Sequence, residues 1–197
     1  LERGHPSFNP ASSSPATDGE RVVAYFGSYG LICFDIAGEK LWEVRLPVAN
    51  TFGGNAASPI IAGDRVILYR GTYGDHFLLA VDKQTGEQLW KVPQHEKITG
   101  EMACTACPIV AGENLIVHSA RSVQALDINS GKQKWIARCA TTATSTPVLA
   151  GGEVVVAAWN KMGEPSLRPP MPNFAALIDE HDRNEDQLIS RDEFPKL

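Results

Sequence analysis

The stretch Ala80–Trp90 reads Ala-Val-Asp-Lys-Gln-Thr-Gly-Glu-Gln-Leu-Trp, and the chain is organised around copies of it. The segment Ala125–Trp135 repeats it as Ala-Leu-Asp-Ile-Asn-Ser-Gly-Lys-Gln-Lys-Trp. A shorter copy, with one turn residue fewer, runs from Asp35 through Gly38 to Trp42. An aspartate, a turn glycine and a tryptophan at nearly fixed offsets define a repeat unit, and such a repeat decides the fold.

A proline followed four residues later by a glycine marks the start of each unit. Each pair follows small residues and precedes an acidic residue and a run rich in Val, Ile and Leu. Short runs of this kind, bounded by glycine, are typical of β-strands. Proline is tolerated where the first strand begins, because an N–H group is not needed there. The four pairs are Pro15–Gly19, Pro59–Gly63, Pro108–Gly112 and Pro147–Gly151.

Each unit is predicted to hold four short antiparallel strands joined by tight turns. The third strand ends in the aspartate, whose side chain accepts from backbone N–H groups two residues on, and the next glycine supplies a positive φ. The fourth strand carries the tryptophan, which we expect to fill the wedge between neighbouring units. The predicted second strands are 21–26, 65–69, 114–118 and 153–158, the third strands are 31–35, 77–82 and 123–127, and the fourth strands are 40–45, 88–92 and 133–137.

The size of the unit indicates the architecture. The four prolines lie 44, 49 and 39 residues apart, and units of that length with four strands are typical of propeller blades. The sequence therefore predicts an all-β fold, a partial β-propeller of four-stranded antiparallel blades. About three and a half blades are present, too few to close a ring, so we expect the rest of the propeller to be missing from this chain.

The pattern Ala-x-Asp-x-x-Thr-Gly-x-x-x-Trp resembles the tryptophan-docking repeat of the pyrroloquinoline quinone (PQQ) propellers, over about residues 12–160. That superfamily includes quinoprotein alcohol and glucose dehydrogenases, and also cofactor-free relatives such as the bacterial outer-membrane assembly lipoprotein. The resemblance implies an exported protein, periplasmic or extracellular. We expect the polar loops 50–57, 102–107 and 141–146 to face the central channel, where propellers bind ligands.

Composition and charge argue against nucleic-acid binding and against a transmembrane segment. The 197 residues are 43% hydrophobic and 21% charged, an ordinary globular balance. The formal net charge is -5 and there is no run of Lys or Arg, which argues against nucleic-acid binding. The apolar run Val154–Trp159 is far too short to cross a bilayer, so no transmembrane segment is predicted.

The last forty residues follow a different pattern. Residues 161–172 are rich in proline and are interpreted as a linker between the blades, 1–160, and a C-terminal segment, 173–197. In that segment Phe174, Leu177 and Ile178 fall at helical spacing, with Asn173 as a candidate N-cap.

The stretch Asp182–Glu193 resembles the twelve-residue EF-hand calcium loop. Its alternating oxygen-bearing residues suit a hard cation, which requires several oxygen ligands at once. Gln187 takes the sixth position, where glycine is usual, and a non-glycine residue with φ > 0 costs about 1–2 kcal/mol, or roughly tenfold in affinity. The predicted calcium ligands are Asp182, Asn184, Asp186, the backbone carbonyl of Leu188, Ser190 and Glu193.

Two interpretations of the cysteines stay open at this stage. Cys104 and Cys107 have Cys-x-x-Cys spacing, but Pro108 stands where haem attachment needs histidine, and no second pair supports a zinc site. Cys107 occupies the small-residue position before the proline, so the first interpretation is a small, buried packing residue. A disulfide between Cys104 and Cys139 is the second hypothesis.

Two functions are compared. The favoured hypothesis is a non-catalytic binding or scaffold propeller with a calcium-binding EF-hand, no PQQ, and protein partners on the propeller surface. The alternative is a fragment of a PQQ-dependent dehydrogenase. Dehydrogenases of this superfamily carry an adjacent Cys-Cys pair and channel carboxylates, and this sequence has no adjacent cysteines.

Overall fold

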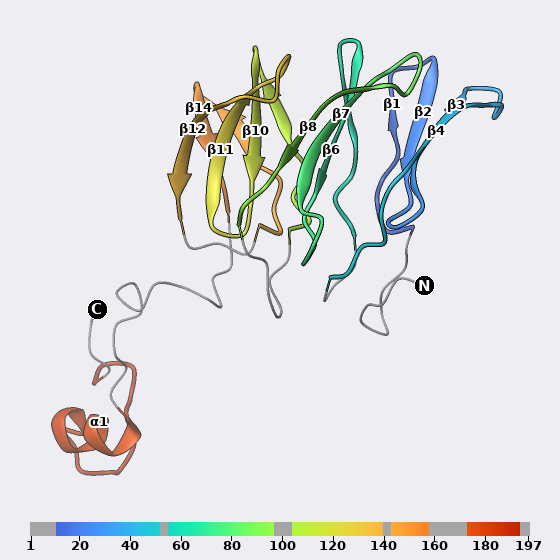
Figure 1. Cartoon of the computed structure of the whole chain (residues 1–197). Helices are drawn as coiled ribbons and strands as arrows, with labels where there is room; N and C mark the ends of the chain where they lie inside the picture. Colours follow the sequence, from blue (N-terminus) through green and yellow to red (C-terminus); the bar gives the residue numbers. More distant parts are fainter. Residues whose placement is uncertain (1–10, 52–54, 97–103, 140–142, 158–172, 194–197) are drawn as a thin grey trace. The chain divides into compact units, whose positions relative to one another are not determined.

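The computed structural model describes residues 11–51, 55–96, 104–139, 143–157 and 173–193, and it separates into two compact units. The first unit, Leu1–Met162, contains the strands, which stand as neighbouring upright sheets in Figure 1. The second unit, Gly163–Leu197, contains the helix. The linker predicted at 161–172 lies outside the described residues.

Within the described residues, the first unit contains three antiparallel sheets of four strands and one of two strands, and strands that follow one another in sequence pair with one another. This order confirms the predicted all-β blades. Blade 1 is β1 (Ala16–Thr17), β2 (Arg21–Tyr25), β3 (Gly30–Asp35) and β4 (Lys40–Arg45); blade 2 is β5 (Ile60–Ala62), β6 (Arg65–Arg70), β7 (Phe77–Asp82) and β8 (Gln88–Pro93); blade 3 is β9 (Ile109–Ala111), β10 (Asn114–His118), β11 (Ser122–Asp127) and β12 (Gln133–Arg138); the half blade is β13 (Val148–Ala150) and β14 (Glu153–Val155).

In the three complete blades the second, third and fourth strands agree with the sequence prediction within one residue at each end. The fourth unit differs, because β14 ends at Val155 although the apolar run continues. The described residues contain no third strand that could pair with β14 and extend it. A strand needs a partner for its backbone groups, so the apolar run alone did not determine its length.

The turns between the third and fourth strands form as predicted. In blade 2 the Asp82 carboxylate accepts from the N–H groups of Gln84 and Thr85, each at 2.8 Å. The glycine of this turn, Gly86, has φ 76°, and its counterpart Gly131 has φ 70°. Side-chain capping and a residue without Cβ therefore reverse the chain in both copies.

Alternate residues of one strand bury against opposite neighbours. Val66 and Leu68 of β6 lie in the apolar core shared with blade 1, whereas Ile67 and Tyr69 lie in the core shared with blade 3. All four side chains are fully buried. A strand with both faces covered reads as a continuous apolar run, which explains the composition of β6.

The helix of the second unit, α1 (Phe174–His181), begins where the sequence predicts. The side-chain oxygen of Asn173 accepts from the N–H of Ala176 at 2.9 Å, so Asn173 is the N-cap. Leu177 is buried, whereas Phe174 is exposed. None of the helices described is long and apolar enough to cross a membrane.

Candidate functional site

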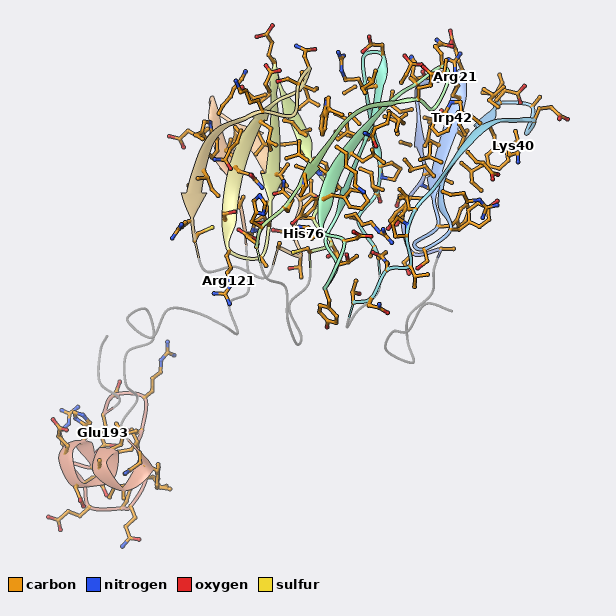
Figure 2. All side chains as sticks on the ribbon, viewed as in Figure 1. Arg21, Lys40, Trp42, His76, Arg121 and Glu193 are labelled. Atoms are coloured by element: carbon orange, nitrogen blue, oxygen red, sulfur yellow. The ribbon has the colours of Figure 1, made fainter. Side chains whose placement is uncertain are left out.

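The loops between blades and the turns between second and third strands meet at one edge of the sheets, which we call the loop edge. Figure 2 shows His76 and Arg121 at this edge and Arg21 at the opposite one. The described residues of the three polar loops predicted to face the channel belong to this edge. Residues 52–54, 102, 103, 141 and 142 of those loops lie outside the described part of the chain.

The residues that precede the four repeat prolines are hydrogen-bonded to one another from blade to blade. The N–H of Ser14 donates to the hydroxyl of Ser58 at 2.9 Å, and the N–H of Ser58 donates to the Cys107 sulfur at 3.3 Å. The N–H of Cys107 donates to the hydroxyl of Thr146 at 3.1 Å. The hydrogen-bond ladder formed by Ser14, Ser58, Cys107 and Thr146 supports the packing interpretation of Cys107, although its side chain is only half-buried.

The four cysteines are free thiols, so the hypothesis of a disulfide between Cys104 and Cys139 is wrong in this structure. Cys104 is buried, and burial raises its thiol pKa to about 11. Burial also raises the pKa of Cys139. Because the thiolate is the reactive form, these two cysteines are poor nucleophiles at neutral pH.

A buried polar pair, which the sequence analysis missed, lies at the loop edge between blades 2 and 3. The Nε2 of His76 is 2.8 Å from the hydroxyl of Tyr69, and its Nδ1 is 3.4 Å from the backbone carbonyl oxygen of Glu96. Both side chains are buried. Burial lowers the pKa of His76, so the imidazole is neutral at physiological pH and stabilises the interface as a hydrogen-bonding group.

The carboxylate of Glu96, which follows β8 of blade 2, contacts blade 3 at the same interface. Ser119 and Ser122 donate their hydroxyl protons to it, Ser122 at 2.5 Å, and the N–H of Arg121 donates at 3.3 Å. Blade 1 has glycine at the two positions that these serines occupy, Gly27 and Gly30. That departure from the repeat was the available signal for a local polar site.

Arg70 is an unusual buried cation, only 1% exposed. One terminal nitrogen, Nη2, donates to the Pro47 carbonyl, whereas Nε and Nη1 have no hydrogen-bond partner among the described residues. The Phe77 ring lies 5.5 Å from the guanidinium. Burying a guanidinium with so few hydrogen-bond partners among the described residues is costly.

The predicted calcium loop is folded around its first residue. The carboxylate of Asp182 accepts from the N–H of Asp186 at 3.2 Å and from the N–H of Gln187 at 2.8 Å. The Nδ2 of Asn184 donates to the Asp186 carboxylate at 3.0 Å, and the N–H of Leu188 donates to the same carboxylate at 2.8 Å. These bonds bring four of the six predicted ligand residues together.

The last residue of the loop closes it. The carboxylate of Glu193 accepts from the N–H groups of Arg183 and Ser190, each at 3.0 Å. Hydrogen bonds from Ser190 hold the pKa of Glu193 low, at about 2. Gln187 has φ 62°, the left-handed conformation expected at the sixth position, and Glu185 has φ 58°, which the sequence did not indicate.

Within the described residues, no group of three or more His, Cys, Asp or Glu side chains is arranged to hold a metal ion. The loop carboxylates instead accept backbone N–H groups, as described for Asp182 and Glu193. Each carboxylate oxygen has two lone pairs, so an oxygen that accepts one N–H group keeps a second lone pair. The loop is therefore closed, but its carboxylates do not converge on a single point.

Comparison with known proteins places the first unit in a family. The family model described as "Outer membrane protein assembly factor BamB" matches residues 4–172. No curated protein matches the chain in sequence.

Solved structures share the fold at low identity. BamB from Moraxella catarrhalis is 21% identical with a TM-score of 0.56, over 71% of this chain and 41% of that one. A quinohemoprotein alcohol dehydrogenase from Comamonas testosteroni is 18% identical with a TM-score of 0.55, over 66% of this chain and 21% of that one. A europium-containing methanol dehydrogenase is 22% identical with a TM-score of 0.51, over 64% and 24%. The chain therefore spans less than half the length of each of these structures.

The blades and their docking tryptophans define a partial β-propeller built from PQQ-type repeats. Within that class, the chain belongs to the family of the outer membrane protein assembly factor BamB.

Proposed function

We propose that the protein is a non-catalytic binding or scaffold segment of a β-propeller, joined to a calcium-binding loop. Membership of the BamB family supports the first part, because the description of that family names an assembly factor. The loop edge supports it as well, since Glu96 is already bonded to Ser119 and Ser122 of blade 3 and His76 is already bonded to Tyr69 within blade 2. The partners would be proteins, and the location periplasmic or extracellular.

A segment of a PQQ-dependent dehydrogenase is the alternative, favoured by the fold shared with two dehydrogenases. The residues present do not fit it. The sequence has no adjacent cysteines, and Glu96, a carboxylate of the loop edge, is already bonded to Ser119 and Ser122. Incubation with PQQ, calcium, a primary alcohol and a redox dye should give no dye reduction, and sustained reduction would favour the dehydrogenase.

The observation that carries the calcium proposal is the closed loop Asp182–Glu193. Its first and last carboxylates already face the loop backbone, and Gln187 already has the positive φ that the sixth position requires. Calcium would be held by oxygens of Asp182, Asn184, Asp186, Ser190 and Glu193 and by the Leu188 carbonyl. Binding requires only that the carboxylates turn toward a common centre, because the backbone reversals are in place.

The test is calcium titration calorimetry on the whole chain, compared with two aspartate variants. The original should give saturable heat with a Kd of about 10⁻⁴–10⁻³ M, the range of weak single modules. Asp182→Ala should abolish the heat. Asp192→Ala, in the same loop but outside the ligand set, should leave Kd within about threefold.

Gln187→Gly provides a gain-of-affinity test. It relieves the left-handed strain at the sixth position, so Kd should fall by roughly tenfold. Absence of heat at millimolar calcium, or equal losses in Asp182→Ala and Asp192→Ala, would refute the calcium site and leave the propeller function untouched.

A further inference from the structure

The interface between blades 1 and 2 and the interface between blades 2 and 3 share one contact. The indole N–H of Trp42 donates to the Lys83 carbonyl at 3.0 Å, and that of Trp90 donates to the Ile128 carbonyl at 3.1 Å. Both acceptor residues directly follow the turn aspartate of the next blade. Because this contact sets the two interfaces in the same frame, residues at equivalent positions of the repeat can be compared between them.

Blades 2 and 3 place different side chains at two equivalent positions of the loop edge. Phe77 and Ser122 each lie five residues before the turn aspartate of their blade. Arg70 pairs with Phe77 across the adjoining strands. In the same way, the N–H of Ser119 donates to the Ser122 carbonyl at 2.8 Å. Arg70 and Phe77 therefore hold the positions of the two serines that bind the Glu96 carboxylate at the other interface.

The residue that supplies the carboxylate has a counterpart too. Glu96 and Val48 each lie six residues after the tryptophan of their blade. The carbonyl of Pro47, the residue before Val48, accepts a hydrogen bond from Nη2 of Arg70. Val48 therefore lies beside Arg70, but its apolar side chain cannot accept a hydrogen bond as Glu96 does. One interface supplies its own carboxylate, whereas the other presents a cation at the equivalent place.

Arg70 keeps unused donors in a buried position. It is 1% exposed, and its Nε and Nη1 have no hydrogen-bond partner among the described residues. The Thr51 hydroxyl, on the loop that contains Pro47, is also buried without a partner in that part of the chain. Lys91 adds a second cation, with its Nζ 4.0 Å from the Phe77 ring. Buried donors without acceptors are costly, and two cations attract an anionic acceptor.

The guanidinium lies directly under the surface. Pro47 is exposed and Val48 is 59% exposed, so the acceptor of the Arg70 hydrogen bond belongs to a surface residue. Further along this loop the Asn50 carbonyl accepts from the N–H of Tyr73 at 2.9 Å, which ties the loop to the turn that follows Arg70. A group that arrives beside Val48 is therefore one layer of residues away from the unused donors.

We propose that Arg70 forms a carboxylate-binding site at the loop edge between blades 1 and 2. The ligand places one carboxylate beside Val48, as Glu96 does at the next interface, and the guanidinium donates to it through charge-assisted hydrogen bonds. The carboxylate comes from an acidic residue of a peptide segment or from a small organic acid, and both sources share this chemistry. The site rests neither on the calcium loop nor on the choice between scaffold and enzyme.

Thermal unfolding of the whole chain at neutral pH and constant ionic strength tests the site. The probes are a capped Gly-Glu-Gly peptide and its matched control Gly-Gln-Gly, which lacks the charge. The glutamate peptide should raise the melting temperature saturably, by about 3–6 °C at about ten times its Kd. That Kd should be on the order of 10⁻³–10⁻² M, because one charge-assisted contact must offset the cost of immobilising the ligand. The glutamine peptide should have no effect.

Sodium acetate, compared with sodium chloride at equal ionic strength, separates the two sources of the carboxylate. A Kd for acetate within about tenfold of the peptide value assigns the site to small organic acids, because the peptide backbone then adds little. A glutamate peptide that binds more than about tenfold more tightly than acetate assigns the site to acidic residues of a protein segment.

Val48→Glu should supply the carboxylate from within the chain. Relative to Val48→Gln, which has the same shape without the charge, it should raise the folding equilibrium constant by about tenfold or more in urea unfolding. Arg70→Met is a control that should fold, since apolar side chains of similar volume often replace buried ions without loss of stability. In that background the gain of Val48→Glu over Val48→Gln should vanish. The response to the glutamate peptide should vanish in Val48→Glu.

Two results with the unmodified chain would overturn the proposal. One is an equal shift with the glutamate and glutamine peptides, and the other is no shift with either carboxylate at about 100 mM. Neither depends on whether a variant folds. Equal stability of Val48→Glu and Val48→Gln would overturn it as well, and so would a gain that persists with Arg70→Met.

Discussion

Two interfaces, between blades 1 and 2 and between blades 2 and 3, use the same tryptophan docking. They differ in the polar contacts that surround it. The first interface is an apolar core with an ion pair at its rim, Lys83 Nζ to Asp18 Oδ2 at 2.7 Å. The second adds the buried His76 and the Glu96 cluster to its core. The repeat thus specifies the docking, and each pair of blades adds its own polar contacts.

The largest expected effect is the loss of stability when a buried tryptophan, rather than an exposed one, is truncated to alanine. Trp90→Ala should lower the free energy of unfolding by about 3–5 kcal/mol, because a large buried side chain is removed and a cavity remains. Trp42→Ala should cost about the same. Trp135→Ala should cost about 1 kcal/mol or less, since much of its ring is exposed. Urea unfolding of the three variants measures these costs, and equal losses would contradict the difference between covered and open blades.

The second prediction separates the two covered interfaces by pH. The pKa of His76 is lowered in the folded protein by burial, so below about pH 6.5 the unfolded chain binds a proton that the folded chain does not. Stability should therefore fall on acidification from pH 6.5 toward the lowered pKa, by at most about 1.4 kcal/mol per pH unit, and be unaffected above that range.

Thermal unfolding across pH 5–8 measures this effect. His76→Gln should flatten the profile, whereas His95→Gln, an exposed histidine of the following loop, should leave it unchanged. A profile that keeps its slope in His76→Gln would place the titrating group elsewhere.

The smallest expected effect belongs to the rim of the first interface. The hydrogen bond from Lys83 holds the pKa of Asp18 well below its usual range. Asp18→Asn should destabilise the protein slightly at low salt, and the difference should shrink near 1 M salt, where charges are screened within about 3 Å. Urea midpoints at two salt concentrations test this, and a salt-independent difference would mean that packing, not charge, is lost.

Residues near one another in sequence account for most of what could be predicted. The strands, the Asp82 turn, the positive φ of Gly86 and the Asn173 cap all depend on contacts within a few residues. The Ser14–Thr146 ladder, the Glu96 cluster and the buried Arg70 depend on contacts between residues more than twenty positions apart. No local pattern specifies such partners, which is why the hypothesis of a disulfide between Cys104 and Cys139 failed.

The sequence by itself determined the repeat, the strand order within each blade and the spacing of the predicted calcium ligands. Strand periodicity, glycine conformation and side-chain capping are short-range effects, and they can be inferred from the order of residues. Only the tertiary structure decided which tryptophans are covered and which thiols and charges are buried. Those properties arise from the neighbour that each blade packs against, so Trp90 is buried and Trp135 remains open although both occupy the same place in the repeat.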